Sequence, residues 1–165
     1  MAKALKSVAK VKDFDTGTKD TSKVANGLAD VLSDTYRLLI KSHIYHWNVE
    51  GPMFYPIHQL TETQYNNLFA ATDELAERIR ALGHVAPSKI GDVVGDHAVG
   101  ETDGKMTAEE MIADLAEDHE RVAHRLHALI ETAEGANDPV TADLATARSG
   151  FHEKAAWMLR ATLGK

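Results

Sequence analysis

Five residues in one stretch of the chain combine the side-chain types that bind first-row transition metals. They follow one another at intervals of 12, 4, 11 and 4 residues: His46, His58, Glu62, Asp73 and Glu77. Residues four apart lie on one face of a helix, so the last four form two helical pairs. Imidazole beside carboxylate suits iron, manganese or zinc. The stretch therefore predicts a metal site.

The spacing of these residues argues against a site within one chain. Glu62 and Asp73 are 11 residues apart, which is about 16 Å along a helix, whereas metal–ligand bonds are about 2 Å. The chain also lacks the Glu-x-x-His pairs that an intrachain di-iron site requires. If all five residues serve one kind of site, two chains related by a two-fold axis must build it. The alternative is a pair of structural histidines with surface carboxylates.

The composition limits the kinds of protein this chain can be. It has 165 residues and no Cys, which excludes disulfides, zinc fingers and cysteine nucleophiles. One domain is expected at this length, and an apolar content of 44% suffices for a single core. We find no apolar run of the length of a membrane span or signal-peptide core, so we expect a cytoplasmic protein without a membrane partner.

The first 20 residues differ from the rest in pattern and charge. They lack apolar periodicity and predict a flexible basic tail at 1–20, ahead of a folded unit at 21–165. The net charge of −7 disfavours nucleic-acid binding by the body of the protein. The tail, however, carries four lysines before its first acidic residue: Lys3, Lys6, Lys10 and Lys12. It is either a disordered solubilising segment or a DNA-binding arm that would associate the protein with the nucleoid.

Caps, breakers and apolar spacing indicate helices throughout the folded unit. The four long helices are expected over about 21–49, 55–82, 107–133 and 140–163. Thr21 or Ser22 can cap the first, and Thr107 with Glu110 forms a capping box for the third. One short helix is expected around Val93, in the long connection between the second and third. This pattern predicts an all-α, ferritin-like four-helix bundle.

Apolar positions three and four residues apart assign an inner face to each helix. On the first, His46 points with Leu39 toward the core side. On the second, the stripe through His58 and Glu62 is unusually polar for a bundle face. The inner positions expected on the third helix are Leu115, His119, Val122, Leu126 and Leu129, and on the fourth Leu144, Phe151, Ala155 and Met158.

The remaining histidines have several interpretations. His119 is expected to be a core histidine with satisfied hydrogen bonds. His43 and His152 pack or, alternatively, support or join a metal site. Three residues on the wet face of the third helix are either solvated or an adventitious zinc site: Glu120, His124 and His127.

Two motifs resemble a known family. The run H-W-N-x-x-G-x-x-F-x-x-x-H-x-x-x-E from His46 to Glu62, followed by D-E-L-A-E-R from Asp73 to Arg78, closely resembles the Dps family of DNA-protecting mini-ferritins. V-T-A-D-L at 140–144 and K-x-x-W-M-L at 154–159 are similar to that family's last helix. The resemblance implies a hollow dodecameric shell with ferroxidase sites at dimer interfaces. There Fe(II) would be oxidised, preferably by hydrogen peroxide, and ferric mineral stored inside, which protects DNA.

The resemblance also assigns roles to individual residues. Four candidate ligands match the family's, namely His46, His58, Asp73 and Glu77. Glu62 stands where Asp is more usual, which keeps a carboxylate but lengthens its reach. Trp47 would donate an electron to a stray oxidant, or only pack an interface. A three-fold pore that concentrates Fe(II) would be lined by acidic residues that also suit helix-capping roles: Glu134, Asp138 and Asp143.

Two other functions stay open at this point. The first is an architectural protein that compacts DNA through its lysine tail and retains a vestigial metal site. The second is a scaffold that binds zinc or manganese in place of iron and has no oxidase activity.

Overall fold

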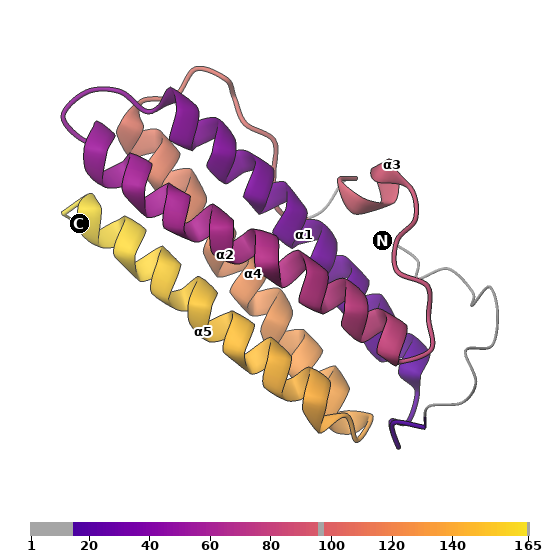
Figure 1. Ribbon diagram of the computed structural model, residues 1–165. Helices are drawn as coiled ribbons and strands as arrows, with labels where there is room; N and C mark the ends of the chain where they lie inside the picture. Colours follow the sequence, from indigo (N-terminus) through magenta and orange to yellow (C-terminus); the bar gives the residue numbers. More distant parts are fainter. Residues whose placement is uncertain (1–14, 96–97, 165) are drawn as a thin grey trace.

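Four long helices form a bundle in the computed structural model, which describes residues 15–95 and 98–164. They are α1 (Thr21–Asn48), α2 (Phe54–Ala81), α4 (Ala108–Gly135) and α5 (Pro139–Thr162), and the short α3 (Ile90–Val93) lies beside α1 (Figure 1). The predicted all-α bundle, with a short helix in its long connection, is confirmed. None of the helices in these ranges is long and apolar enough to cross a membrane.

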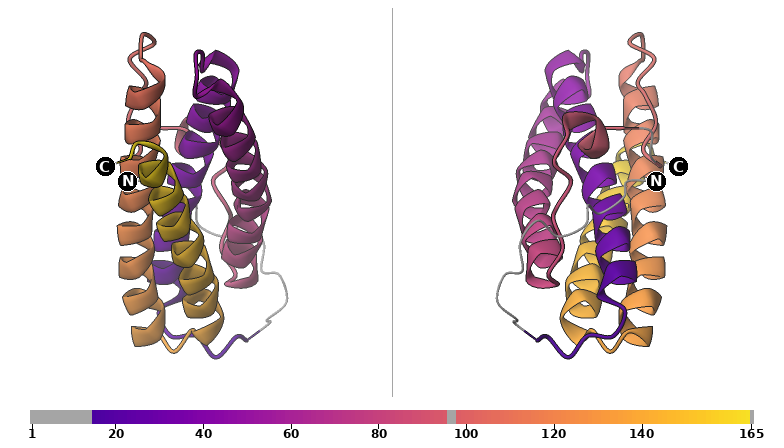
Figure 2. Two further views of the ribbon diagram at one scale, coloured as in Figure 1. Left: turned by 90° about the vertical axis from the view of Figure 1, so that its left-hand side faces the viewer. Right: turned by 90° about the vertical axis from the view of Figure 1, so that its right-hand side faces the viewer.

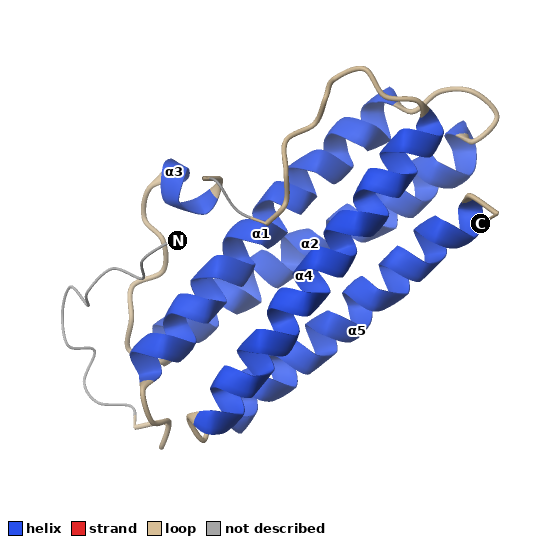
Figure 3. Ribbon diagram, turned by 180° about the vertical axis from the view of Figure 1, so that it is seen from behind, coloured by secondary structure: helices blue, strands red, loops and turns tan. Residues whose placement is uncertain are grey.

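The helices are arranged as two antiparallel pairs joined by one long crossover. Figure 2 shows the pair α1 and α2 beside the pair α4 and α5. The connection between α2 and α4 runs along the outside of the bundle, so that α4 starts at the end where α2 started (Figure 3). A single long crossover is the connectivity of ferritin-like bundles.

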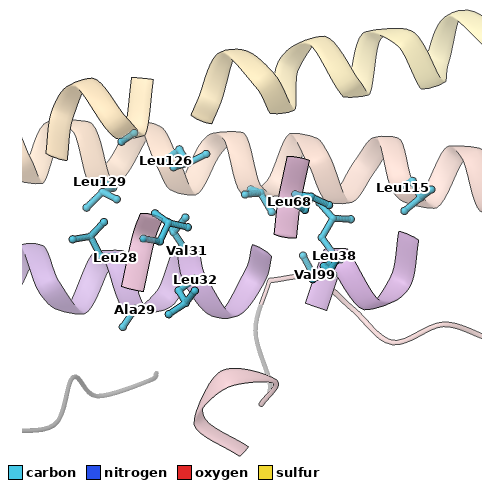
Figure 4. Close-up of a cluster of buried hydrophobic side chains, with 14 of the residues drawn as sticks. Leu28, Ala29, Val31, Leu32, Leu38, Leu68, Val99, Leu115, Leu126 and Leu129 are labelled. Atoms are coloured by element: carbon cyan, nitrogen blue, oxygen red, sulfur yellow. The ribbon is translucent and has the colours of Figure 1, made fainter. Parts of the chain in front are cut away.

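Leucines hold the two pairs together where α1 meets α4. Leu28 and Leu129 point toward each other across this contact (Figure 4), and both are buried. A Cβ atom added at Gly27 would lie 2.9 Å from Leu129 Cδ1, so the absence of a side chain at Gly27 lets the two helices approach closely. The core therefore rests on aliphatic packing between α1 and α4.

The helix ends agree with the sequence except at the first cap. Thr107 and Glu110 form the predicted capping box, and Asp138 caps α5 by accepting from the Thr141 amide. The predicted cap of α1 was wrong: Asp20, not Thr21 or Ser22, accepts from the Lys23 amide. A carboxylate caps a helix as well as a hydroxyl does, so Asp20, immediately before Thr21, can act as the N-cap of α1.

Two predicted helix faces need correction. On α5 the expected inner residue Met158 is 36% exposed, and the residues that face inward include Arg148 and His152. Periodicity missed this face because it is polar and rich in small residues. On α2 the polar stripe turns out to lie outside the core, since Phe69 is 66% exposed; the inward residues of α2 are Ile57, Thr61, Gln64, Leu68, Ala71, Thr72, Leu75 and Ile79.

A buried ion network also joins α1 to α4. The Lys41 ammonium, 3% exposed, donates to Asp114 Oδ2 at 2.7 Å and to the fully buried Asp118. The Tyr45 hydroxyl donates to Asp114 Oδ2 at 2.6 Å. Burial raises the pKa of Asp118, against the opposing effect of Lys41 and of Arg121. Lys41 is thus the central cation of a network that has little access to water.

We therefore expect Lys41→Met to lower the free energy of unfolding by about 3–5 kcal/mol. The substitution leaves the half-buried Asp114 without a cation among the described residues and the buried Asp118 with Arg121 alone. Urea unfolding at fixed protein concentration measures the change. Arg160→Met is the matched control: its ion pair with Glu120 is about half exposed, and its loss should cost below about 1 kcal/mol. Equal losses in the two variants would contradict the assigned role of Lys41.

Candidate metal centre

The turn between α1 and α2 places two of the predicted ligands side by side. His46 lies in the last turn of α1 and His58 near the start of α2. Gly51, with a φ of 84°, reverses the chain between them. As a result the two imidazole rings stack with centroids 3.7 Å apart and planes 16° from parallel.

Each histidine of this pair is held by the backbone of the other. His46 Nδ1 lies 2.9 Å from the His58 carbonyl oxygen, and His58 Nδ1 lies 2.9 Å from the His46 carbonyl oxygen. A carbonyl oxygen only accepts, so both Nδ1 atoms carry the hydrogen and donate it. The Nε2 atom of each neutral ring then keeps a lone pair. Hydrogen bonds of this kind are how proteins fix metal-binding histidines in a single tautomer.

The three carboxylates of the predicted set lie along α2. Glu62, one turn after His58, is partly buried, whereas Asp73 and Glu77 are exposed farther along the helix. Gln59 Nε2 donates to Glu62 at 3.5 Å. Within the described residues no Lys or Arg forms an ion pair with any of the three. Their negative charge is therefore left for a cation.

One chain brings together only part of the predicted set. Residues 15–95 and 98–164 contain no group of three His, Asp or Glu side chains that could hold a metal ion. His46 and His58 are adjacent, and Glu62 follows on the same side of α2, whereas Asp73 and Glu77 form a separate pair beyond it. The site shared between two chains stays a prediction.

Aromatic rings connect the histidine pair to the surface. Tyr65 meets the His46 ring edge-on with a centroid distance of 5.2 Å, and it contacts the His43 ring at 4.1 Å. His43 in turn stacks on Trp47, which is 67% exposed. Burial, together with the charge of His46, lowers the pKa of His43. Tyr65 was not predicted from the sequence as a neighbour of the histidine pair. Its position three residues after Glu62, on the same face of α2, could have indicated this contact.

The acidic residues predicted for a pore differ in their surroundings. Glu134 and Asp143 are exposed, whereas Asp138 is 1% exposed and accepts from the Arg78 guanidinium at 2.6 Å. Burial alone would raise the pKa of Asp138, but the hydrogen bonds from Arg78 and Thr141 outweigh it and lower the pKa. Asp138 therefore serves the fold of its own chain, and the pore stays a prediction. The lysines of the tail, Lys3, Lys6, Lys10 and Lys12, lie outside the described residues.

A second histidine pair is buried in the opposite half of the bundle. His119 and His152 are both fully buried, and their Nδ1 atoms lie 2.9 Å apart, so that one hydrogen is shared between them. Neither Nε2 atom has a hydrogen-bond partner among the residues that the structure describes. His119 is therefore a core histidine, as predicted, but only one of its ring nitrogens is hydrogen-bonded. Burial, with a contribution from Arg148, lowers the pKa of His119 to about 3. The pKa of His152 is also lowered, chiefly by burial and in addition by His119 and Arg148.

Comparison with known proteins gives a consistent set of likenesses. Residues 25–165 match the ferritin-like domain. The DNA protection during starvation protein 2 of Bacillus anthracis is 33% identical over 134 residues, which cover 81% of this chain and 92% of the relative. The Dps structure from Thermosynechococcus elongatus superposes with a TM-score of 0.83 at 32% identity, covering 86% of this chain and 90% of that one. A Dps protein from Vibrio cholerae, described as a member of the ferritin-like diiron-carboxylate superfamily, gives a TM-score of 0.84 at 26% identity over 95% and 99% of the two chains.

The pair of His119 and His152 predicts an acid-sensitive fold. Because the folded pKa values lie below the ordinary value of about 6.5, acidification protonates these histidines in the unfolded chain but not in the folded one. The stability they contribute is complete above pH about 6.5 and falls below it. His119, whose folded pKa is about 3, should cost about 2 kcal/mol between pH about 7 and about 5, and His152 should add a loss of the same sign.

Urea unfolding over a pH series checks this effect against the double variant His119→Leu/His152→Leu. The apolar pair removes both titrating groups together, so neither is left without a partner. Its unfolding free energy should fall less steeply with acidification than that of the native chain. Parallel pH profiles would show that the two histidines are not responsible.

Proposed function

The chain belongs to the Dps family of ferritin-like proteins, and on this basis we propose that it is a ferroxidase that oxidises Fe(II) at sites shared between two chains and stores Fe(III) in a closed dodecameric shell. Hydrogen peroxide is the proposed oxidant. Iron is the substrate of this reaction and, as mineral, its product. Fe(II) and hydrogen peroxide together generate radicals, so the removal of both would account for the DNA protection that the names of the relatives describe.

The observation that carries the proposal is the locked histidine pair. His46 and His58 each donate from Nδ1 to the carbonyl of the other, so the neutral form of each ring is the tautomer that presents its Nε2 lone pair. Neutral imidazole suits Fe(II), and carboxylate oxygens stabilise Fe(III). The carboxylates of Glu62, Asp73 and Glu77 have no basic partner among the described residues. The donor set therefore fits both oxidation states of iron.

The reaction balances with two iron ions for each peroxide. Two Fe(II) ions give one electron each, the O–O bond of H2O2 breaks, and two protons are taken up to form two water molecules. The protein's own contribution is to hold the two irons by fixed ligands and to leave positions open for peroxide. In this scheme Trp47, which is exposed and stacked on His43, would supply an electron when only one iron is bound.

Exposed aromatic residues support a two-chain site. Trp47, Phe54 and Tyr55 are 67%, 44% and 71% exposed, and they flank the end of the bundle where His46 and His58 lie. Phe69, 66% exposed, lies between Glu62 and Asp73 on α2. Large apolar groups around a polar centre are typical of protein interfaces. A two-fold axis with antiparallel α2 helices would cover these rings and bring Asp73 and Glu77 of one chain to the histidines of the other.

Mixing two inactive variants tests the shared site. His46→Ala chains and Asp73→Ala chains should each lose the fast phase of iron oxidation by peroxide. In a mixed dimer, one site carries both substitutions and the other carries neither. Random pairing makes half of the dimers mixed, so co-assembled chains should recover about a quarter of the native fast phase. The absorbance of ferric iron in a stopped-flow instrument measures it.

A site within one chain would recover no activity on mixing, because every chain would lack one ligand. The control is the same two variants combined after separate assembly, which should remain inactive. Native rates in both single variants would instead overturn the assignment of the ligands.

The similarity to DNA protection proteins supports one alternative function, DNA compaction. A DNA-compacting protein would act through Lys3, Lys6, Lys10 and Lys12, and its affinity would fall steeply with salt. Gel retardation of the full chain and of a chain without residues 1–12, over a salt series, separates the two functions. If DNA is retarded only by the full chain at low salt, the tail is a DNA-binding arm. If it is retarded by neither, DNA compaction is excluded and iron oxidation alone accounts for protection.

A further inference from the structure

A second cluster of ligand-type side chains lies between α4 and α5, on the helix pair that does not carry the proposed ferroxidase residues. His127 comes from α4, and Ser149 and Glu153 lie one turn apart on α5. His127 Nε2 is 3.0 Å from Glu153 Oε1 and 2.9 Å from Ser149 Oγ, and Ser149 Oγ donates to Glu153 Oε1 at 3.1 Å. Three donor atoms of three residues thus form a nearly equilateral triangle.

The size of this triangle matches one face of a coordination octahedron. Bonds from a first-row divalent cation to nitrogen or oxygen are about 2.1 Å long. Two ligands at right angles around such an ion lie about 3.0 Å apart, which is the spacing of the three donor atoms here. One cation above the triangle could therefore contact all three without a backbone movement.

The charge around the triangle also favours a cation. Glu153 forms no ion pair with a Lys or Arg of the described residues, and its partners are His127 and Ser149. The neighbouring Glu120 differs, because the Arg160 guanidinium neutralises it through two hydrogen bonds of 2.6 and 2.8 Å. From the sequence we expected Glu120 to lie with His124 and His127 on α4. In the structure the carboxylate that contacts His127 is that of Glu153 on α5.

The triangle opens into a groove with room for further ligands. The groove has a volume of about 730 Å³ and is lined by both His127 and Glu153, together with His124. The His124 ring centroid is 6.2 Å from that of His127. The side chains of His127 and Glu153 are 51% and 59% exposed. Water can therefore complete the coordination, and His124 lies in the same groove.

We propose that His127 Nε2, Glu153 Oε1 and Ser149 Oγ bind a divalent transition-metal cation of the zinc class. One imidazole and one carboxylate select such an ion over Mg²⁺ or Ca²⁺, which take oxygen ligands alone. A hydroxyl and water in the other positions make this a weaker site than a fully protein-ligated one. It is independent of the ferroxidase centre, since none of its residues belongs to α1 or α2.

Calorimetric titration of the assembled, metal-free protein with zinc tests the site. The double variant His46→Ala/Asp73→Ala serves as background, so that zinc binding at the proposed ferroxidase centre does not contribute. One zinc per chain should bind in this background. Adding Glu153→Gln should weaken that binding by at least the roughly 10–100-fold that loss of a supporting residue costs. Glu120→Gln, a loss of the same charge in the same groove, should leave it unchanged.

Zinc-soaked crystals of the native chain supply a second measurement that does not depend on the background variants. An anomalous peak within bonding distance of His127 Nε2 and Glu153 Oε1 is expected, and it should vanish in Glu153→Gln, whose iron oxidation should remain native. The absence of a peak in the native crystals would overturn the proposal. Equal weakening by Glu120→Gln and Glu153→Gln would also overturn it, because zinc would then be held by the general charge of the groove.

Discussion

The reciprocal hydrogen bonds between His46 and His58 are the constraint on which the candidate centre depends. Each ring is oriented by a carbonyl of the other helix, so the tautomers, the stacking and the angle of the α1–α2 turn are set together. Substitution of either side chain would remove its own hydrogen bond and the ring stacking, while the backbone carbonyl that orients the other ring would remain. The same contact therefore connects the two helices at one end of the bundle and orients the two imidazole nitrogens that the proposed iron site would use.

Several buried charged groups elsewhere in the bundle are paired within the chain, in contrast with the exposed carboxylates on α2. Lys41 pairs with Asp114 and Asp118, Arg121 also pairs with Asp118, and Arg78 pairs with Asp138. Burial makes an unpaired charge costly, so such groups find partners where water is excluded. On the water-exposed stripe of α2 no such requirement exists, and Asp73 and Glu77 can stay without a cationic partner. Because Asp73 and Glu77 are exposed, the absence of a Lys or Arg partner among the described residues costs the fold little. It also leaves both carboxylates available for the cation of the proposed site.

The helices and the capping box of α4 could be predicted because they depend on residues near one another in the chain. Thr107 with Glu110 is an example, since a capping box spans a single turn. Relations across helices could not be read in this way. His127 faces Glu153 rather than Glu120, and the inner face of α5 carries Arg148 and His152 where periodicity favoured Met158. A buried polar face has no signature in apolar spacing, so only the packed structure reveals it.

A site shared between two chains would couple assembly to metal binding. Within one chain Asp73 and Glu77 are like charges one turn apart, and a dimer would bring the carboxylate of Glu62 of another chain close to them, which raises the repulsion. Iron would relieve that repulsion and the exposed aromatic rings would offset it. Thermodynamic linkage makes this coupling reciprocal: the free energy by which dimer formation strengthens cation binding equals the free energy by which cation binding stabilises the dimer. In such a dimer, Fe(II) binding would stabilise the assembly, and assembly would raise the affinity for Fe(II) by the same free energy.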